Sequence, residues 1–137
     1  MKRVVLLAAL VVAISATMPS VGAAAKGRTF VTNNCHLVRF RPQYILFACG
    51  DGAFYARRLE WDTWHRWRAV GHGVFHQNDC DPNCADGTFH KAGGRIVLKK
   101  RDRCPDVHHY VFTRAAIRFE ESLLGRDRVG TSIGCPV

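Results

Sequence analysis

Several signatures of enzymes are absent from this sequence of 137 residues. It has no Gly-x-Ser-x-Gly nucleophile elbow, no His-Glu-x-x-His zinc motif and no phosphate-binding loop. Serine is scarce in residues 26–137, which contain only Ser122 and Ser132. Asp51, Glu60 and Asp62 could supply the paired acid and base of a small hydrolase, but their spacing alone does not support such a pair. We therefore expect a protein that is not an enzyme, and a hydrolase is the weakest alternative.

Long apolar runs are also missing, apart from residues 4–16. This run of 13 residues is shorter than the roughly 20 that span a membrane. It follows a lysine and an arginine and precedes small residues, a pattern typical of a secretory signal peptide cleaved after Ala23 or Ala25. We expect residues 1–25 to be removed, leaving no transmembrane segment. Residues 26–137 should then form one secreted domain, either extracellular or associated with the cell envelope.

Acidic residues are few, 11 against 20 lysines and arginines, which gives a net charge of +9. Loss of the two basic residues in the signal peptide leaves +7. A basic surface attracts anionic polymers. Export removes intracellular nucleic acid as a partner, and no nucleic-acid-binding signature is present. We therefore expect anionic or carbohydrate polymers of the cell envelope as partners. There is no sequon for N-glycosylation.

All six cysteines lie in the predicted mature domain: Cys35, Cys49, Cys80, Cys84, Cys104 and Cys135. An even number of cysteines in a small exported domain is typical of a disulfide framework. We predict that Cys104 pairs with Cys135. The other predicted bridges join Cys35 and Cys49 to the cysteines of the 80–84 loop, in either order, since this would pin the loop to upstream strands. A direct bond between Cys80 and Cys84 is the alternative and closes a very small ring.

Short apolar and aromatic segments separated by turns predict an all-β domain, mainly an antiparallel sandwich or small barrel. The expected strands are residues 28–32, 43–49, 53–61, 67–76, 95–98 and 107–121. A short helix near 114–124 competes with the last strand, because Ala115-Ala116 and Glu120-Glu121 favour helix. The β-branched and aromatic content of 110–119 favours a strand. The tail from Gly125 is expected to be a loop.

Residues 61–67 carry three tryptophans together with His65 and Arg66. Flat aromatic rings can stack on sugar rings while polar neighbours bond the hydroxyl groups. A small protein also needs aromatic volume in its core. We expect Trp61 and Trp64 in the core and Trp67 on the surface.

A run of basic residues follows the strand predicted at 95–98. This run can be interpreted as the solvated tip of a hairpin with no binding role. The alternative is that its positive charges attract the protein to an anionic surface. The candidate ligand-binding residues are Trp67, Arg66, Arg68, Lys99, Lys100, Arg101 and Arg103.

The loop at 78–87 is rich in aspartate and asparagine. Asp79, Asp81 and Asn83 match the first ligand positions of an EF-hand, but a cysteine replaces its glycine and a histidine its glutamate. A different calcium site would use Asp79, Asp81, Asn83 and Asp86. We favour the interpretation that these side chains shape the loop. No cofactor is expected.

A zinc site is a further alternative for the same loop. His76, Cys80, Cys84 and His90 supply two imidazoles and two thiols at spacings seen in zinc sites. In an oxidising compartment, disulfide formation is the stronger expectation for these cysteines.

Five motifs occur in order along the chain. They are Arg41-Pro42, Ala48-Cys49-Gly50-Asp51-Gly52, Leu59-x-Trp61-x-x-Trp64, Asn78-Asp79-Cys80-x-Pro82-x-Cys84-Ala85-x-Gly87 and Val111-Phe112-Thr113-Arg114. In this order and spacing they resemble a group of small, uncharacterised secreted proteins of actinobacteria. The resemblance implies a bacterial source, secretion and a compact disulfide-bonded domain. It implies no catalytic residues.

Overall fold

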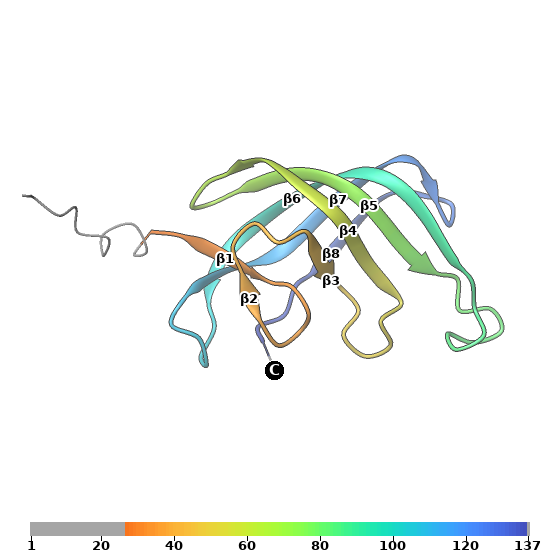
Figure 1. The fold of residues 1–137 in the computed structure, drawn as a ribbon, viewed down its shortest axis with the longest axis horizontal. Helices are drawn as coiled ribbons and strands as arrows, with labels where there is room; N and C mark the ends of the chain where they lie inside the picture. The colour runs from red at the N-terminus through yellow and green to blue at the C-terminus, as the bar shows by residue number, and fades with distance from the viewer. Residues whose placement is uncertain (1–26, 137) are drawn as a thin grey trace, which may run out of the picture.

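The computed structural model describes residues 27–136, so the predicted signal peptide lies outside the described residues. These residues form eight β-strands and no helix (Figure 1). The strands are β1 Thr29–Thr32, β2 Val38–Arg39, β3 Tyr44–Leu46, β4 Phe54–Trp64, β5 Ala69–Asn78, β6 Phe89–Arg103, β7 Tyr110–Leu123 and β8 Arg126–Ser132. The predicted all-β class is confirmed. Within this part of the chain, no helix is long and apolar enough to cross a membrane.

The strands form one curled sheet, a half-barrel. Its order is β2-β1-β7-β6-β5-β4-β3, and β8 pairs with the remaining length of β7. The long strands β4 to β7 arch over the short strands β1, β2 and β3 (Figure 1). All pairs are antiparallel except β1 with β7, which is parallel.

Contacts between distant segments draw the two ends of the sheet together. The amide of Leu46, in the edge strand β3, donates to the carbonyl oxygen of Asn33 at the end of β1 (2.7 Å). The Cys35–Cys49 disulfide joins the same two regions. The hydroxyl of Thr32 donates to the carbonyl oxygen of Gly134 (2.9 Å), which holds the C-terminal tail against β1.

The concave side of the sheet holds the core. In β5, Ala69, Gly71 and Phe75 are buried on this side. The core is filled by Leu59, Phe75, Ile96, Leu98, Phe112, Ile117, Phe119 and Leu123, among others. Burial of each large apolar side chain contributes about 1.5–3 kcal/mol relative to exposure.

A bulge in β4 interrupts its pairing with β5. The β4–β5 register shifts between Arg57 and Glu60, opposite Gly73 of β5. A Cβ at Gly73 would lie 2.9 Å from both the Arg57 carbonyl oxygen and Leu59 Cδ2. Glycine is required there because the bulged strand passes so close to it.

The three tryptophans divide as expected. Trp61 and Trp64 pack against the core, and their rings meet edge to face at 4.6 Å. Their indole N–H groups donate to the carbonyl oxygens of Pro42 (2.9 Å) and Thr29 (2.8 Å). Trp67 stands in the turn between β4 and β5 and is 63% exposed.

In the last third of the chain, the favoured strand is confirmed and the loop predicted from Gly125 is wrong. Residues 114–123, within the segment considered as a short helix, belong to strand β7. Ala115, Ile117 and Phe119 are buried at a period of two, and this burial outweighs local helix propensity. The tail is not a loop, because Leu124 and Gly125 form a two-residue turn with φ values of 47° and 74° that leads into β8.

Candidate functional site

The basic run from Lys99 to Arg103 lies within β6, so the hairpin-tip prediction is wrong. Lys99 pairs with Arg114 on the convex side, and Arg101 pairs with the core residue Phe112. Lys100, between them, has a φ of 57°, outside the extended region, and this interrupts the alternation of faces. The run is therefore divided between the two sides of the sheet.

Four of the predicted ligand-binding residues gather around a tyrosine at one end of the sheet. The guanidinium carbon of Arg101 lies 5.1 Å from the ring centre of Trp67 and 3.2 Å from that of Tyr110. Arg66 covers the Trp67 ring and Arg103 the Tyr110 ring, each at 5.0 Å. Such cation–π contacts stabilise a guanidinium without neutralising its charge. We call these five residues the arginine–aromatic cluster.

A buried threonine anchors the cluster. The Thr29 hydroxyl, in a side chain 1% exposed, accepts a hydrogen bond from Arg101 Nε (3.1 Å) and donates one to the Arg66 carbonyl oxygen (2.7 Å). Arg101 Nη2 is enclosed and has no acceptor in the structure. The guanidinium is thus held in place while the N–H groups of its Nη2 stay unused.

Tyr110 senses the positive field of the cluster. Its pKa is lowered from the ordinary value, first by the charge of Arg103 and then by the hydrogen bond and charge of Arg101. Sequence reasoning missed Tyr110, since nothing in the local pattern marks it. Only the strand register places it beside the arginines.

A second group of arginines lies on the convex side. Arg95 of β6 pairs directly with Arg118 of β7, and Arg118 pairs with Arg128 of β8. All three side chains are exposed. Like charges directly opposite one another destabilise a sheet. We call these three residues the arginine row. None of the three was among the candidate ligand-binding residues, because their register across the strands cannot be obtained from one sequence.

An apolar depression of about 440 Å³ lies beside the arginine row. Val97 and Ala116, which are neighbours across β6 and β7, contribute to its lining together with the three arginines. A ligand on this surface would therefore meet apolar carbon as well as positive charge.

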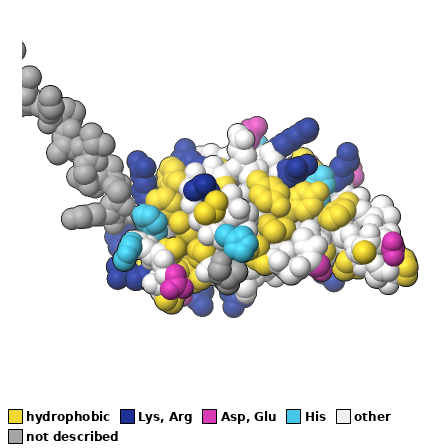
Figure 2. All heavy atoms as spheres, turned by 60° about the horizontal axis from the view of Figure 1, so that its bottom comes forward, with side chains coloured by type: hydrophobic (Ala, Val, Ile, Leu, Met, Phe, Trp, Pro, Cys, Tyr) yellow, Lys and Arg dark blue, Asp and Glu magenta, His cyan; other side chains and the backbone are white. Residues whose placement is uncertain are grey.

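The positive charges are not neutralised within the protein. Among residues 27–136, no lysine or arginine nitrogen lies within 4.0 Å of a carboxylate oxygen. The ion-pair contacts that exist there join His72 to Glu60 and Asp62, and His90 to Asp79. Figure 2 shows dark blue basic side chains projecting around the rim of one face, with few acidic ones.

The remaining predicted basic residues lie outside the arginine–aromatic cluster. Lys99 stands opposite Arg114 on the convex side. The carbonyl oxygen of Lys100 accepts the Thr113 hydroxyl (3.0 Å), and that of Arg68 accepts the His65 amide (2.8 Å) to close the β4–β5 turn. Their positive side chains add to the general field but contact no ring.

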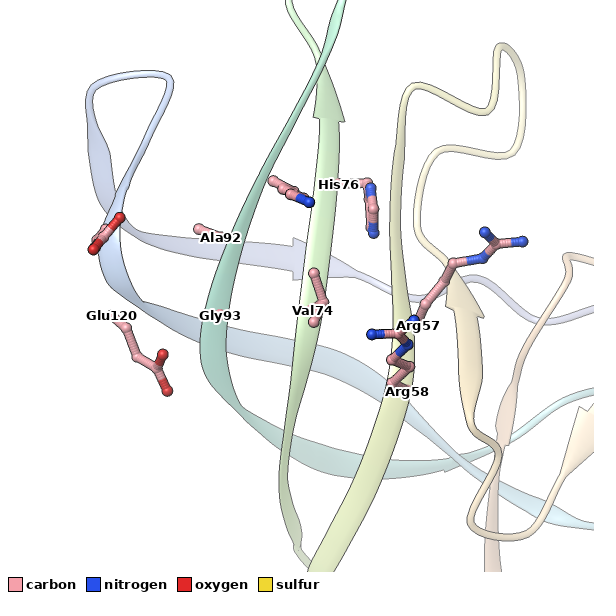
Figure 3. A pocket seen from close by; sticks show the side chains of 9 residues that line it. Arg57, Arg58, Val74, His76, Ala92, Gly93 and Glu120 are labelled. Atoms are coloured by element: carbon pink, nitrogen blue, oxygen red, sulfur yellow. The ribbon is translucent and has the colours of Figure 1, made fainter.

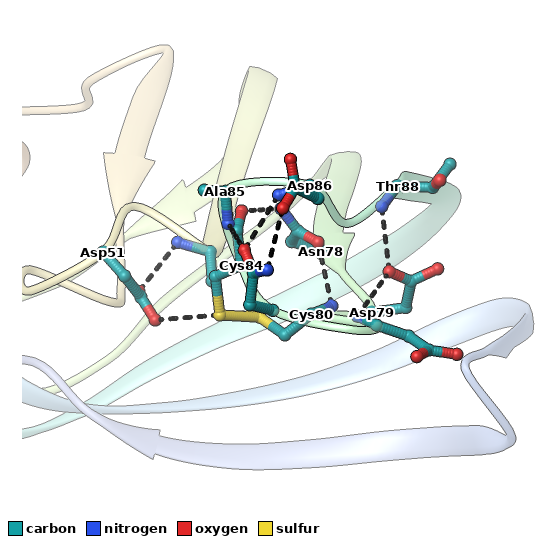
Figure 4. The surroundings of a disulfide bond; sticks show 11 residues. Asp51, Asn78, Asp79, Cys80, Cys84, Ala85, Asp86 and Thr88 are labelled. Atoms are coloured by element: carbon teal, nitrogen blue, oxygen red, sulfur yellow. Dashed lines mark hydrogen bonds between the residues drawn. A yellow bond between two sulfur atoms is a disulfide. The ribbon is translucent and has the colours of Figure 1, made fainter.

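In the loop that carries the predicted calcium ligands, the polar side chains bond to the loop itself (Figure 4). Asp79 accepts the amides of Asp81 (3.2 Å) and Thr88 (2.8 Å) and contacts His90 Nε2 at 2.9 Å. The pKa of Asp79 is lowered, mainly by the His90 hydrogen bond and then by those two amides. The lone pairs that a cation would need are thus engaged at Asp79.

Two of the other three candidate ligands, Asn83 and Asp86, are also engaged. Asn83 Oδ1 accepts the amides of Ala85 (2.9 Å) and Asp86 (3.1 Å), while Asn83 Nδ2 donates to Asp86 Oδ2 (2.8 Å). These are the contacts of a loop shaped by its own side chains.

The zinc alternative conflicts with the structure, because its two cysteines are bonded to each other. Within the described residues, Asp51, Cys80 and Cys84 form the one group of three metal-ligating side chains close enough to share an ion. Asp51 Oδ2 lies 3.7 Å from Cys84 Sγ. Zinc is bound by thiolates, which a disulfide does not provide.

The disulfide prediction is confirmed for Cys104–Cys135 and wrong for the other two bridges. The structure pairs Cys35 with Cys49 and Cys80 with Cys84. Asn78 explains the small ring: its Oδ1 accepts the Cys80 amide and its Nδ2 donates to the Cys84 carbonyl oxygen, both at 2.9 Å (Figure 4). These bonds fold the loop back until the two Cα atoms are 3.8 Å apart.

No family model, curated protein or solved structure matches this chain. The resemblance to small secreted actinobacterial proteins stays a prediction.

Proposed function

We propose that this protein is a secreted, non-enzymatic domain that binds acidic polysaccharides at the cell envelope or outside the cell. Three disulfides in a domain of this size are consistent with an extracellular protein. The net charge of +7 without the predicted signal peptide favours an anionic ligand.

The arginine row carries the proposal. Neighbouring strands are roughly 5 Å apart, so Arg95, Arg118 and Arg128 present three positive charges at about that interval. No carboxylate among the described residues lies within 4.0 Å of these charges. A polymer with regularly repeated anionic groups would relieve the repulsion within the row, and single anions would do so less completely.

The arginine–aromatic cluster favours a carbohydrate over other polyanions. Trp67 is 63% exposed, and its indole can stack on the C–H face of a sugar ring. Arg95 and Arg101 are six residues apart in β6, about 20 Å along the strand. Because Arg95 lies on the convex side and Arg101 on the core side, a chain of several sugar units would have to pass around the end of the sheet to contact both.

Retention on immobilised dextran sulfate, with neutral dextran as the matched matrix, tests the proposal. We expect retention on the sulfated matrix at low salt and release as salt is raised, because the Debye length falls from about 30 Å at 0.01 M to about 3 Å at 1 M. Retention that is absent or insensitive to salt contradicts the proposal.

Two variants locate the binding surface. Arg118→Gln should elute at lower salt than the control Arg39→Gln, which removes the same charge from the exposed strand β2, where Arg39 contacts only the Val38 carbonyl oxygen. Trp67→Ala should weaken retention on dextran sulfate more than on polyphosphate, which has no sugar ring. Equal elution of Arg118→Gln and Arg39→Gln would exclude the arginine row.

A further inference from the structure

A depression of about 500 Å³ opens where strands β4 to β7 lie side by side (Figure 3). This volume is within the range of small-molecule sites. Its charged lining differs in sign from one side to the other. Arg57 and Arg58 come from β4, whereas Glu120 and Glu121 come from β7. In Figure 3 the two labelled arginines and Glu120 lie on opposite sides of β5 and β6.

The strand register sets the separation of these charges. Arg57 pairs with Val74, Val74 pairs with Gly93, and the carboxyl group of Glu120 lies over Gly93. The four residues thus form a line across four adjacent strands. At roughly 5 Å per strand, the backbones of Arg57 and Glu120 are about 14 Å apart.

The opposite charges share the depression without pairing. Neither Glu120 nor Glu121 has a lysine or arginine nitrogen of residues 27–136 within 4.0 Å. Lys91 of β6 adds a third positive charge to the lining. The hydrogen-bonding groups at both sides therefore stay available to a ligand.

The floor of the depression depends on a glycine and a histidine. A Cβ at Gly93 would meet the Glu120 carboxyl group, whose Cδ is 3.1 Å from the position it would take. His76 stacks on Tyr55 with ring centres 4.8 Å apart and planes 9° apart, which fixes its ring. Its pKa is lowered, first by burial and then by Arg57, Lys91 and Arg58, so the imidazole is neutral at pH 7 and can both donate and accept.

We propose that this depression binds a short peptide with free termini. The carboxylate would contact Arg57, Arg58 and Lys91, and the ammonium group would contact Glu120 and Glu121. Charge-assisted hydrogen bonds of this kind are the strong ones in such sites. A single α-amino acid carries both charges on one carbon and is too short to meet both sides, whereas two or three residues extend for about 7–10 Å. This site is independent of the proposed polysaccharide binding.

Calorimetric titration of the purified protein with trialanine tests the assignment, using N-acetyl-trialanine and trialanine amide as matched ligands. We expect trialanine to bind and each blocked peptide to bind at least about tenfold more weakly, since each lacks one charged contact. Equal binding of all three peptides, or no binding of trialanine, would overturn the proposal. Free alanine binding as tightly as trialanine would overturn the assignment of a peptide.

Two variants should show which side of the depression binds each terminus of the peptide. Glu120→Gln should weaken trialanine binding and remove the preference over the acetylated peptide, whereas Arg57→Gln should remove the preference over the amide. The control Arg39→Gln should keep both preferences. Thermal unfolding of each variant checks the fold, and unchanged preferences in folded Glu120→Gln and Arg57→Gln contradict the site. Because Glu120→Gln should not weaken retention on dextran sulfate, failure of this proposal is distinguishable from failure of polysaccharide binding.

Discussion

Thr29 and Tyr110 pair directly in the parallel β1–β7 ladder, and Arg101 contacts both side chains. The hydroxyl of Thr29 orients the guanidinium of Arg101 from one side, and the Tyr110 ring covers it at 3.2 Å. The short N-terminal strand therefore helps to build the arginine–aromatic cluster. β1 lies next to β7 in the sheet. The same short strand therefore takes part both in closing the sheet and in holding Arg101 of the cluster.

The Tyr110 phenol should ionise at a lower pH than a free tyrosine, because Arg103 and Arg101 lower its pKa. The ionised phenol of Tyr110 should stabilise the folded protein. This contribution to the free energy of unfolding is present above the pKa of the unfolded state and is lost as pH falls through the lower pKa of the folded state. Absorbance titration should show this early phenolate, followed last by Tyr44, whose pKa is raised chiefly by burial. Arg103→Gln should move the early transition to higher pH. An early transition that survives in Tyr110→Phe would contradict the assignment.

Truncation of Trp67 should affect ligand retention, whereas truncation of Trp64 should affect stability. Trp67→Ala should change the free energy of unfolding by less than about 0.5 kcal/mol, because the ring is 63% exposed, while weakening retention on dextran sulfate. Trp64→Ala should lower the free energy of unfolding by about 3 kcal/mol, since it removes core contacts and the bond to Thr29. Urea unfolding measures both, and equal losses of stability would contradict the assigned environments.

The three disulfides should contribute unequally to stability. The Cys80–Cys84 bridge closes a ring with a sequence separation of 4, and the Cys104–Cys135 bridge one with a separation of 31. The entropy of loop closure gives about 2 kcal/mol for the first and about 4 kcal/mol for the second. When each of these two cysteine pairs is replaced by alanine, urea unfolding should show the smaller loss in free energy of unfolding for the 80–84 pair and the larger loss for the 104–135 pair. A larger loss from the 80–84 pair would mean that its loop has a further role in the fold.

Arg118→Gln should stabilise the sheet, because Arg118 is the middle member of the arginine row. Removal of its charge should raise the free energy of unfolding by about 0.5 kcal/mol at low salt, with a smaller gain at high salt. Arg39→Gln provides the control with the same change in net charge. Loss of stability in Arg118→Gln at low salt would show that the row is not a source of repulsion.

The strands whose burial alternates were predictable from the sequence. In β7, Ala115, Ile117 and Phe119 are buried at a period of two because one face of the strand meets the core. β8 was missed because its exposed and charged residues leave no such pattern, and only its pairing with β7 makes it a strand. The β1–β7 parallel pair was also missed, since the two strands are about eighty residues apart and no local signal links them.

The sequence by itself determined the all-β class, the basic charge, the disulfide framework as a set of six cysteines and the division of the tryptophans between core and surface. These properties depend on composition and on patterns within a few neighbouring residues. The tertiary structure alone decided how the first four cysteines pair, that Arg95, Arg118 and Arg128 form a row, and that Tyr110 lies under Arg101. Each of these depends on strand register and on the curl of the sheet, which are set by contacts between residues far apart in the chain.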